Sequence, residues 1–207
     1  MSEPDDAAVL DSAADDAIER AAAAIADGDL VVYPTETVYG LAADATDPEA
    51  IERVFEAKGR SRDEPVSMAV PDVGTALAYT CPTEREEQFM REFLPGPVTV
   101  VVDRWEMLPD VLTGGQSKVG IRIPDHPVAL ALLEEAGAVT ATSANISGNP
   151  SATTVDELDE IVRRAAVVLD AGETDGGTGS TVVDVEAGTI YRRGAEADAV
   201  EAWLDSE

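Results

Sequence analysis

Residues that could carry covalent or transition-metal chemistry are scarce in this sequence of 207 residues. It holds one cysteine, Cys81, and one histidine, His126, so an intrachain disulfide and a His/Cys zinc site are both excluded. Cys81 lies in a Thr-Cys-Pro turn, and His126 precedes Pro127 at an expected helix start, so we expect neither to be a nucleophile or a base. A single cysteine is typical of a reducing compartment, so we expect a cytoplasmic protein.

Lysine and long apolar runs are scarce as well. Lys58 and Lys118 are the only lysines among 14 basic residues, which face 42 acidic ones, and the formal net charge is −28. No apolar run approaches the roughly 20 residues of a membrane helix, so we expect no contact with a membrane. An acidic, lysine-poor surface repels itself unless ions screen it, which indicates a halophilic source. Because this charge also opposes nucleic acid, any phosphate site should be local and concave.

Apolar residues alternate between helical and extended periodicity along the chain, which predicts an α/β fold with a mixed sheet. Helices are expected at 12–27, 48–58, 83–93, 127–136, 154–164 and 195–204. Strands are expected at 30–33, 66–70, 98–102, 119–123, 139–142, 167–169, 181–185 and 189–192. The final strands are too close in sequence for a parallel crossover, so they should pair antiparallel. The expected parts are an acidic tail at 1–11, one α/β domain at 12–194 and a short terminal helix or tail at 195–207.

Half of the basic residues fall into three short clusters. These clusters are Lys58-Arg60-Arg62, Lys118-Arg122 and Arg192-Arg193. Basic residues that are retained in so acidic a chain indicate a functional role, such as binding nucleotide phosphates or a carboxylate. Pairing of each cluster with its acidic neighbours is the alternative.

Two loops are rich in small polar residues. The loops 143–153 and 172–180 contain many Gly, Ser, Thr and Asn residues, which suits phosphate contact through backbone N–H groups but also suits a flexible turn. Ser143 lacks the sequence context of a serine nucleophile. The residues alone therefore predict an α/β domain with a polyanion-binding cavity, and they leave the reaction open.

Several motifs in a fixed order resemble one family. They are Tyr33-Pro-Thr-Glu-Thr-Val-Tyr-Gly-Leu41, Lys58-Gly-Arg60, Pro95-Gly-Pro-Val-Thr99, Val119-Gly-Ile-Arg-Ile-Pro124, Ser143-Ala-Asn-Ile-Ser-Gly148 and Ser180-Thr-Val-Val-Asp184. The chain is similar to the YrdC-like family of threonylcarbamoyl-AMP synthases from about residue 12 to residue 194, and it resembles the short, single-domain type. The resemblance implies a twisted open mixed sheet with flanking helices around a concave cationic cavity.

The resemblance also implies a reaction. A member of this family would be an L-threonylcarbamoyladenylate synthase, a nucleotidyltransferase that forms threonylcarbamoyl-AMP and pyrophosphate from L-threonine, bicarbonate and ATP. Mg²⁺ would accompany ATP and share the phosphate charge. The product would pass to a tRNA threonylcarbamoyl transferase complex, which would modify tRNAs that read codons beginning with A.

Site roles follow from the same resemblance. The residues implied to bind ATP are Lys58, Arg60, Ser143, Asn145, Ser151 and Arg192. The residues implied to bind L-threonine are Thr35, Thr37, Arg122 and Ser180. Lys58 and Arg60 are also implied to be catalytic, and Arg122 to hold the threonine carboxylate as a bidentate fork. Ligands of the metal are left unassigned.

Some positions depart from the family pattern. Ser61 stands where proline is frequent, Glu64 where asparagine or lysine is common, and Lys118 where a small hydroxyl residue is frequent; a histidine found near Met68-Ala69 in longer members is missing. Three alternatives are left open: an RNA-binding or ribosome-associated module with weak RNA contact, a paralogue acting on another substrate, and a carbamoyl-transfer domain of a maturation factor.

Overall fold

The computed structural model describes residues 8–206, and within them ten strands form one mixed sheet. In chain order the strands are β1 (Val9–Asp11), β2 (Leu30–Tyr33), β3 (Gly40–Ala42), β4 (Ser67–Ala69), β5 (Val98–Asp103), β6 (Lys118–Arg122), β7 (Val139–Ser143), β8 (Ala166–Asp170), β9 (Thr181–Asp184) and β10 (Thr189–Arg192). Their order across the sheet is β1-β8-β2-β3-β7-β4-β6-β5-β9-β10. Parallel and antiparallel neighbours both occur, which confirms the predicted α/β fold with a mixed sheet.

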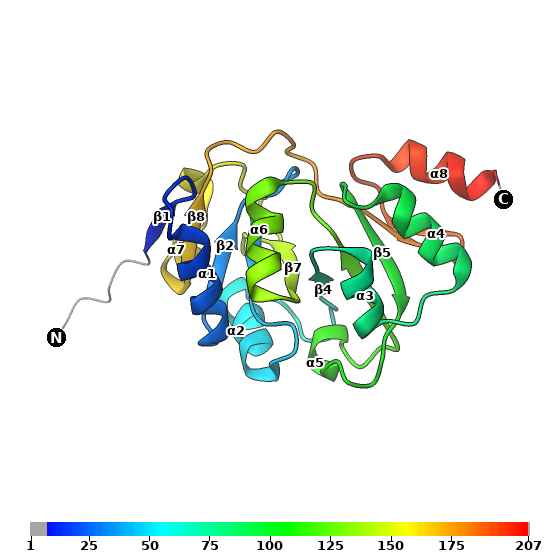
Figure 1. Ribbon diagram of the computed structural model, residues 1–207, viewed down its shortest axis with the longest axis horizontal. Helices are drawn as coiled ribbons and strands as arrows, with labels where there is room; N and C mark the ends of the chain where they lie inside the picture. Colours follow the sequence, from blue (N-terminus) through cyan, green and yellow to red (C-terminus); the bar gives the residue numbers. More distant parts are fainter. Residues whose placement is uncertain (1–7, 207) are drawn as a thin grey trace.

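Helices cover both faces of one half of this sheet. The helices are α1 (Ala17–Ala26), α2 (Pro48–Lys58), α3 (Val73–Tyr79), α4 (Glu84–Phe93), α5 (Asp110–Thr113), α6 (Pro127–Ala136), η1 (Val155–Glu157, a 3₁₀ turn), α7 (Glu160–Ala165) and α8 (Ala197–Asp205). Ile25 of α1 packs with Val31 of β2 on one face, and α6 lies beside α1 (Figure 1). Val54 of α2 and Val162 of α7 pack with Val32 on the opposite face. Successive strand residues point to opposite faces, so β2 is buried on both sides.

The other half of the sheet has a core on one face only. Val98, Val100 and Val102 of β5 pack in the same core as Phe89 and Met90 of α4, and Figure 1 shows α3, α4 and α8 over this half. Strands β4, β6, β5 and β9 therefore present their alternate residues to an uncovered, concave face. The fold thus leaves room for a cavity there.

Three helix ends follow the sequence as predicted. Asp47 caps α2 by accepting a hydrogen bond from the N–H of Glu49, Pro48 occupies the first turn, and Gly59 ends the helix in the left-handed conformation. Thr83 and Glu86 form a complete capping box at the start of α4. β9 and β10 pair antiparallel, as their short connection requires.

Two predicted helices are wrong in their limits. The helix expected at 12–27 begins only at Ala17, because residues 12–16 form turns in which the N–H groups of Ala13 and Ala14 donate to Asp11. Val9–Asp11, inside the range expected to be a tail, is a strand that pairs parallel with β8. The helix expected at 154–164 is a 3₁₀ turn followed by α7, because the Glu157 carboxylate accepts hydrogen bonds from Thr153 N and Oγ1 rather than capping at Thr154. Residues 1–7 of the expected tail lie outside the described residues, and the domain limits at 12 and 194 stay a prediction.

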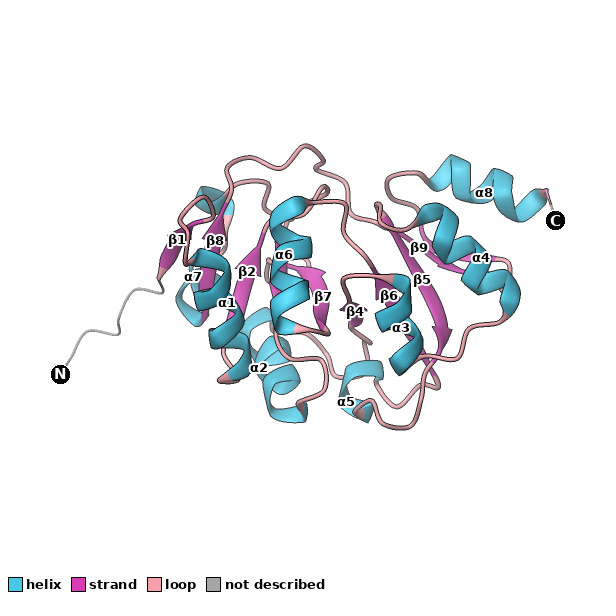
Figure 2. Ribbon diagram, viewed as in Figure 1, coloured by secondary structure: helices cyan, strands magenta, loops and turns pink. Residues whose placement is uncertain are grey.

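The connection from β8 to β9 contains neither helix nor strand. Figure 2 shows this loop crossing the molecule from β8 to β9, and it includes the predicted polar loop 172–180. It rests on the β2–β3 turn, where Thr174 Oγ1 and Gly177 N–H donate to the carbonyl oxygen of Thr37 at 3.2 and 2.7 Å. In residues 8–206 no helix is long and apolar enough to span a bilayer.

Candidate active site

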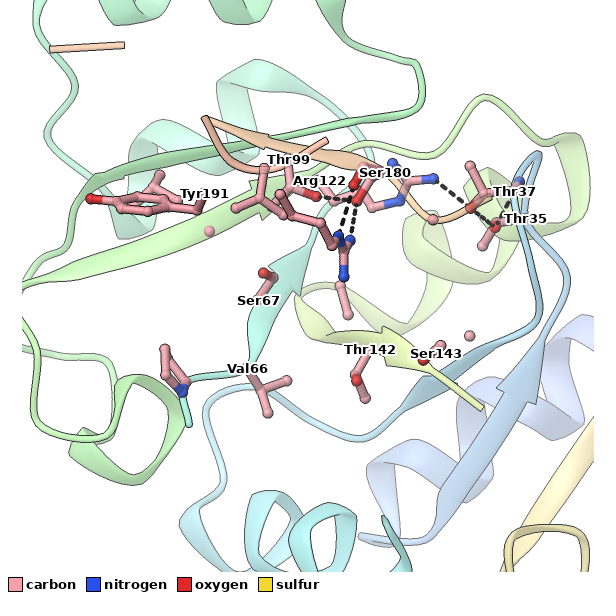
Figure 3. A pocket seen from close by; sticks show the side chains of 18 of the residues that line it. Thr35, Thr37, Val66, Ser67, Thr99, Arg122, Thr142, Ser143, Ser180 and Tyr191 are labelled. Atoms are coloured by element: carbon pink, nitrogen blue, oxygen red, sulfur yellow. Dashed lines mark hydrogen bonds between the residues drawn. The ribbon is translucent and has the colours of Figure 1, made fainter. Parts of the chain in front are cut away.

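A cavity of roughly 950 Å³ lies on the uncovered face of the sheet. Its floor consists of alternate residues along the strands: Thr99 and Val101 of β5, Lys118, Gly120 and Arg122 of β6, Ser180 just before β9, and Val182 and Asp184 of β9. The intervening residues of these strands point into the core on the other side. Figure 3 shows residues from these separate strands and from the β2–β3 turn converging on the same space.

Arg122 is the most heavily engaged cation of the cavity. Its Nη1 donates to the carbonyl oxygens of Gly96 and Val98 at 3.1 and 3.5 Å. Its Nη2 donates to Thr37 Oγ1 at 3.1 Å and lies 3.0 Å from the Glu36 carboxylate. The guanidinium therefore fastens the β2–β3 turn to the start of β5. A bidentate grip on a ligand carboxylate would have to share these donors or displace one of their partners.

The two predicted threonines of the β2–β3 turn are held by each other. Thr35 Oγ1 lies 3.0 Å from Thr37 Oγ1, donates to Val38 O at 2.7 Å and accepts from Thr37 N–H at 3.2 Å. Both side chains line the cavity although both residues are buried. Their hydroxyls are thus fixed at the edge of the cavity beside Arg122 (Figure 3).

Arg192 and Ser180 form a second polar group on the floor. Arg192 Nε and Nη2 donate to Ser180 O and Oγ, each at 3.0 Å, and Ser180 Oγ lies 2.8 Å from Thr99 Oγ1. Burial, with Arg122 and Arg60 nearby, lowers the pKa of the Arg192 guanidinium. Positive side chains that lie close enough to lower the pKa of Arg192 indicate a local excess of positive charge, which favours an anionic ligand.

Arg60 lines the cavity from the loop after α2. Its Nε and Nη2 donate to the backbone oxygens of Glu64 and Pro65 at 3.2 and 3.0 Å, and the Glu64 carboxylate lies 3.7 Å from Nε. Glu64, one of the departures from the family pattern, therefore partly offsets the charge of Arg60. Arg62 lies outside the cavity and pairs with Glu52.

Lys58 and Asn145 do not line the cavity. The Lys58 ammonium donates to the backbone oxygens of Ser143 and Asn145, and the residue is only 1% exposed. Burial, reinforced by Arg60, lowers the pKa of Lys58 to about 8. The Asn145 amide donates to Ile146 O and Asn149 O at 2.8 and 2.9 Å. Both side chains thus shape the loop after β7 from behind the cavity wall.

The loop after β7 presents Ser143 and Ser151 to the cavity. Asp159, which the sequence analysis missed, holds this loop by accepting from Ile146 N–H at 2.7 Å and from the Asn149 amide at 3.0 Å. No sequence motif identifies Asp159, because its partners are a backbone group and an amide more than nine residues away.

Lys118 marks the opposite end of β6 from Arg122. Its ammonium lies 2.9 Å from Asp184 Oδ2 and 3.3 Å from Glu186 Oε2. Burial alone would raise the pKa of the Asp184 carboxyl, but the Lys118 ammonium and the Ala187 N–H hold it below its ordinary value. The ring of Tyr191 lines the same end, and its O–H lies 3.4 Å from Asp184. Sequence reasoning missed Asp184 and Tyr191, which only strand alternation brings to the cavity.

One cavity therefore gathers eight of the ten predicted site residues. The eight residues on its wall are Thr35, Thr37, Arg60, Arg122, Ser143, Ser151, Ser180 and Arg192. In residues 8–206 no group of three or more His, Cys, Asp or Glu side chains could hold a metal ion. A mixed sheet with a cationic cavity on its open face defines an α/β protein whose cavity suits a small anionic ligand.

Comparison with known proteins identifies the family. The sequence model of the Sua5, YciO and YrdC family, described as "Telomere recombination", matches residues 23–194, so the chain belongs to this family. A threonylcarbamoyl-AMP synthase of Pyrococcus abyssi is 42% identical over 172 residues, which are 81% of this chain and 50% of that protein. A putative threonylcarbamoyl-AMP synthase of Mycobacterium tuberculosis is 41% identical over 83% of this chain and 80% of its own length.

A solved structure has the same fold. It is the crystal structure of P. abyssi Sua5 complexed with L-threonine, with a TM-score of 0.81 and 37% identity, covering 88% of this chain and 56% of that chain. The chain thus spans about half the length of the Pyrococcus relative. The expected family and its twisted mixed sheet with flanking helices are both confirmed.

Proposed function

We propose that this protein is a threonylcarbamoyl-AMP synthase, a nucleotidyltransferase that uses L-threonine, bicarbonate and ATP. The observation that carries the proposal is the single cavity. It brings Thr35, Thr37 and Arg122 together with Arg60 and Arg192, so one space offers hydroxyls for an amino acid and cations for a polyphosphate. Relatives of this chain bear the name of that enzyme, and one related structure holds L-threonine.

The reaction asks the protein for positioning and for positive charge. The threonine amine attacks the carbon of bicarbonate, the new N–C bond gives a carbamate, and water leaves. A carbamate oxygen then attacks the α-phosphorus of ATP in line, and the bond to the β-phosphate oxygen breaks as pyrophosphate departs. No protein nucleophile takes part, so catalysis rests on orientation and on charge stabilisation.

Residue roles follow the geometry of the cavity. Arg122 and the hydroxyls of Thr35 and Thr37 face the amino acid, while Arg60 and Arg192 lower the energy of the negative charge that develops on the phosphates. Lys58 acts from behind the wall, where its ammonium fixes the loop that presents Ser143. Ser180 belongs to both groups, because it contacts Arg192 and Thr99.

The donor set suits a magnesium ion that enters with ATP. Asp184 is the carboxylate on the cavity lining, and Lys118 already engages it. Mg²⁺ commonly binds through substrate phosphates and keeps several waters, so it needs no protein cage. The hydroxyls of Ser143 and Ser151 are the neutral oxygens on the nucleotide side that could add to its shell. When bound, Mg²⁺ would offset the charge of the leaving pyrophosphate.

In the cell the product would go to a tRNA threonylcarbamoyl transferase complex, and the protein would work in a salt-rich cytoplasm. The acidic surface argues against direct RNA binding as the main role. Pyrophosphate release from ATP in molar KCl tests the proposal, because it should require both L-threonine and bicarbonate. Intact ATP binding without such release would favour the RNA-binding alternative or a paralogue acting on another substrate.

A further inference from the structure

Tyr33 carries an unused hydrogen-bond donor at the cavity wall. It is 2% exposed and lines the cavity, yet its O–H has no acceptor among residues 8–206. Tyr39 is equally buried, but its O–H donates to Gly172 O at 2.7 Å. A buried tyrosine O–H usually finds a partner, since leaving it unmet is costly. The Tyr33 O–H is not among the fully enclosed polar atoms of residues 8–206, so it opens on the cavity and is free to donate to a ligand there.

The ring of Tyr33 is fixed in place by its neighbour across the sheet. Tyr33 of β2 lies directly opposite Gly40 of β3, where a Cβ atom would be 2.8 Å from ring atom Cε1 and 3.0 Å from Cζ. Only glycine allows the ring to lie so close to the backbone. Gly40 is in turn paired with Ser143 of β7. The phenol thus stands between the turn that carries Thr35 and the strand that carries Ser143.

The surroundings keep the phenol a neutral donor in a positive field. Burial raises the pKa of Tyr33 to about 12, and nearby Arg122 lowers it less than burial raises it, while Glu36 adds to the rise. The O–H therefore stays protonated through the physiological range. Tyr33 and Arg122 line the same cavity, so an anion drawn to Arg122 would enter the space onto which this donor opens.

We propose that Tyr33 is a substrate-contacting residue whose O–H donates a hydrogen bond to an oxygen of the anionic amino-acid substrate. That oxygen belongs either to the α-carboxylate or to the carbamate formed on the amine. The inference rests on the proposed function and extends it, because it adds a donor at the junction between the amino-acid side and the nucleotide side. No proton is transferred; the bond only orients and stabilises the oxyanion.

Tyr33→Phe tests this inference with a minimal change, because the ring and its packing on Gly40 remain. We expect kcat/KM for L-threonine to fall roughly 10- to 100-fold, as for a hydrogen bond to a charged group, with KM for ATP unchanged. A contact with the carboxylate would raise KM and weaken L-threonine binding measured by calorimetry. A contact with the carbamate would lower kcat and leave L-threonine binding intact.

The matched control is Tyr79→Phe, which removes a hydroxyl from α3, outside the cavity. Tyr79→Phe should leave kcat, KM and L-threonine binding unchanged. Tyr33→Phe with wild-type kcat, KM and L-threonine binding would overturn the inference while the proposed function stands. Wild-type protein that binds L-threonine but releases no pyrophosphate would contradict the proposed function, and calorimetry on Tyr33→Phe would then still test the contact with the α-carboxylate. Wild-type protein that binds no L-threonine would overturn both.

Discussion

Three arginines, Arg60, Arg122 and Arg192, bring positive charge into a molecule that carries a net charge of −28. Arg122 is paired with Glu36 and Arg60 lies near Glu64, whereas Arg192 has no carboxylate partner among residues 8–206. Backbone oxygens fix the direction of each guanidinium, so the ligand meets cations that need little reorganisation.

Replacing Arg60 should impair the chemistry more than the fold. Arg60→Ala removes a cavity cation that would stabilise the phosphates in the transition state, so we expect kcat/KM to fall on the order of 10²-fold or more. Arg62→Ala is the matched control, because Arg62 lies two residues away, outside the cavity, and forms an ion pair with Glu52. Steady-state pyrophosphate release measures both variants. Equal activity of the two would remove the role assigned to Arg60.

Lys58 should make stability depend on pH. Its pKa of about 8 in the folded state lies below the ordinary 10.5, so the unfolded chain binds more protons between these values. The free energy of unfolding of the wild type should therefore rise with pH in this window, relative to Lys58→Met, which keeps the volume without the charge. From about pH 7 to about pH 9.5 the difference should grow by about 2 kcal/mol. Urea titrations at several pH values measure it, and a constant difference would contradict the assigned pKa.

At the scale of elements, strand β6 sets the length of the cavity. Lys118, Gly120 and Arg122 point to the same side, so the ends of this row are separated by about 13 Å of strand. The glycine between them is required by close packing, because a Cβ there would collide with Ser67 Oγ and lie 2.9 Å from Thr99 Cγ2.

Gly120→Ala should therefore disturb the floor of the cavity. The added methyl must displace Ser67 or Thr99, so we expect a loss of about 1–3 kcal/mol in stability and a higher KM for at least one substrate. Thermal unfolding together with KM for ATP and for L-threonine tests this. An unchanged melting temperature together with unchanged KM values for ATP and L-threonine would contradict this prediction, because it would mean that Ser67 and Thr99 move aside without loss of stability.

The elements with complete end signals were predictable from sequence. Asp47, Pro48 and Gly59 fix both ends of α2, and the capping box starting at Thr83 fixes the start of α4. β3 and α5 were missed, because three or four residues are too short to show a period. The helix expected from Thr154 failed because the same spacing also fits a tight turn closed by Glu157.

The candidate site was predictable only in part. Motifs identified the residues but not whether each side chain points into the cavity. Lys58 and Asn145 were therefore assigned to ATP, although both side chains lie behind the cavity wall and bind backbone oxygens. Tyr33 and Asp184 were missed as site residues, because their exposure to the cavity depends on strand register. Register is set by pairing between distant segments, which local patterns do not contain.

At the scale of the whole molecule, positive charge is concentrated in the cavity on the open half of the sheet, while the exposed surface is acidic. The covered half of the sheet is a packed scaffold, and the open half holds the cavity with its arginines. The many acidic residues on exposed positions repel each other at low salt.

This charge predicts dependence on salt. Because ions screen the repulsion within a Debye length, the melting temperature should rise by roughly 10 °C or more from low salt to molar KCl. Thermal unfolding followed by circular dichroism measures it. Equal melting temperatures at both concentrations would contradict the proposed halophilic adaptation.

The central claim, that this cavity joins L-threonine, bicarbonate and ATP, is tested most directly by isolating the product. Protein incubated in molar KCl with ATP, L-threonine and ¹³C-labelled bicarbonate should yield threonylcarbamoyl-AMP that carries the label in its carbamoyl carbon, detected by mass spectrometry, together with pyrophosphate. The same mixture without L-threonine should yield neither. An enzyme preparation that binds ATP and L-threonine but forms no labelled adenylate would contradict the claim.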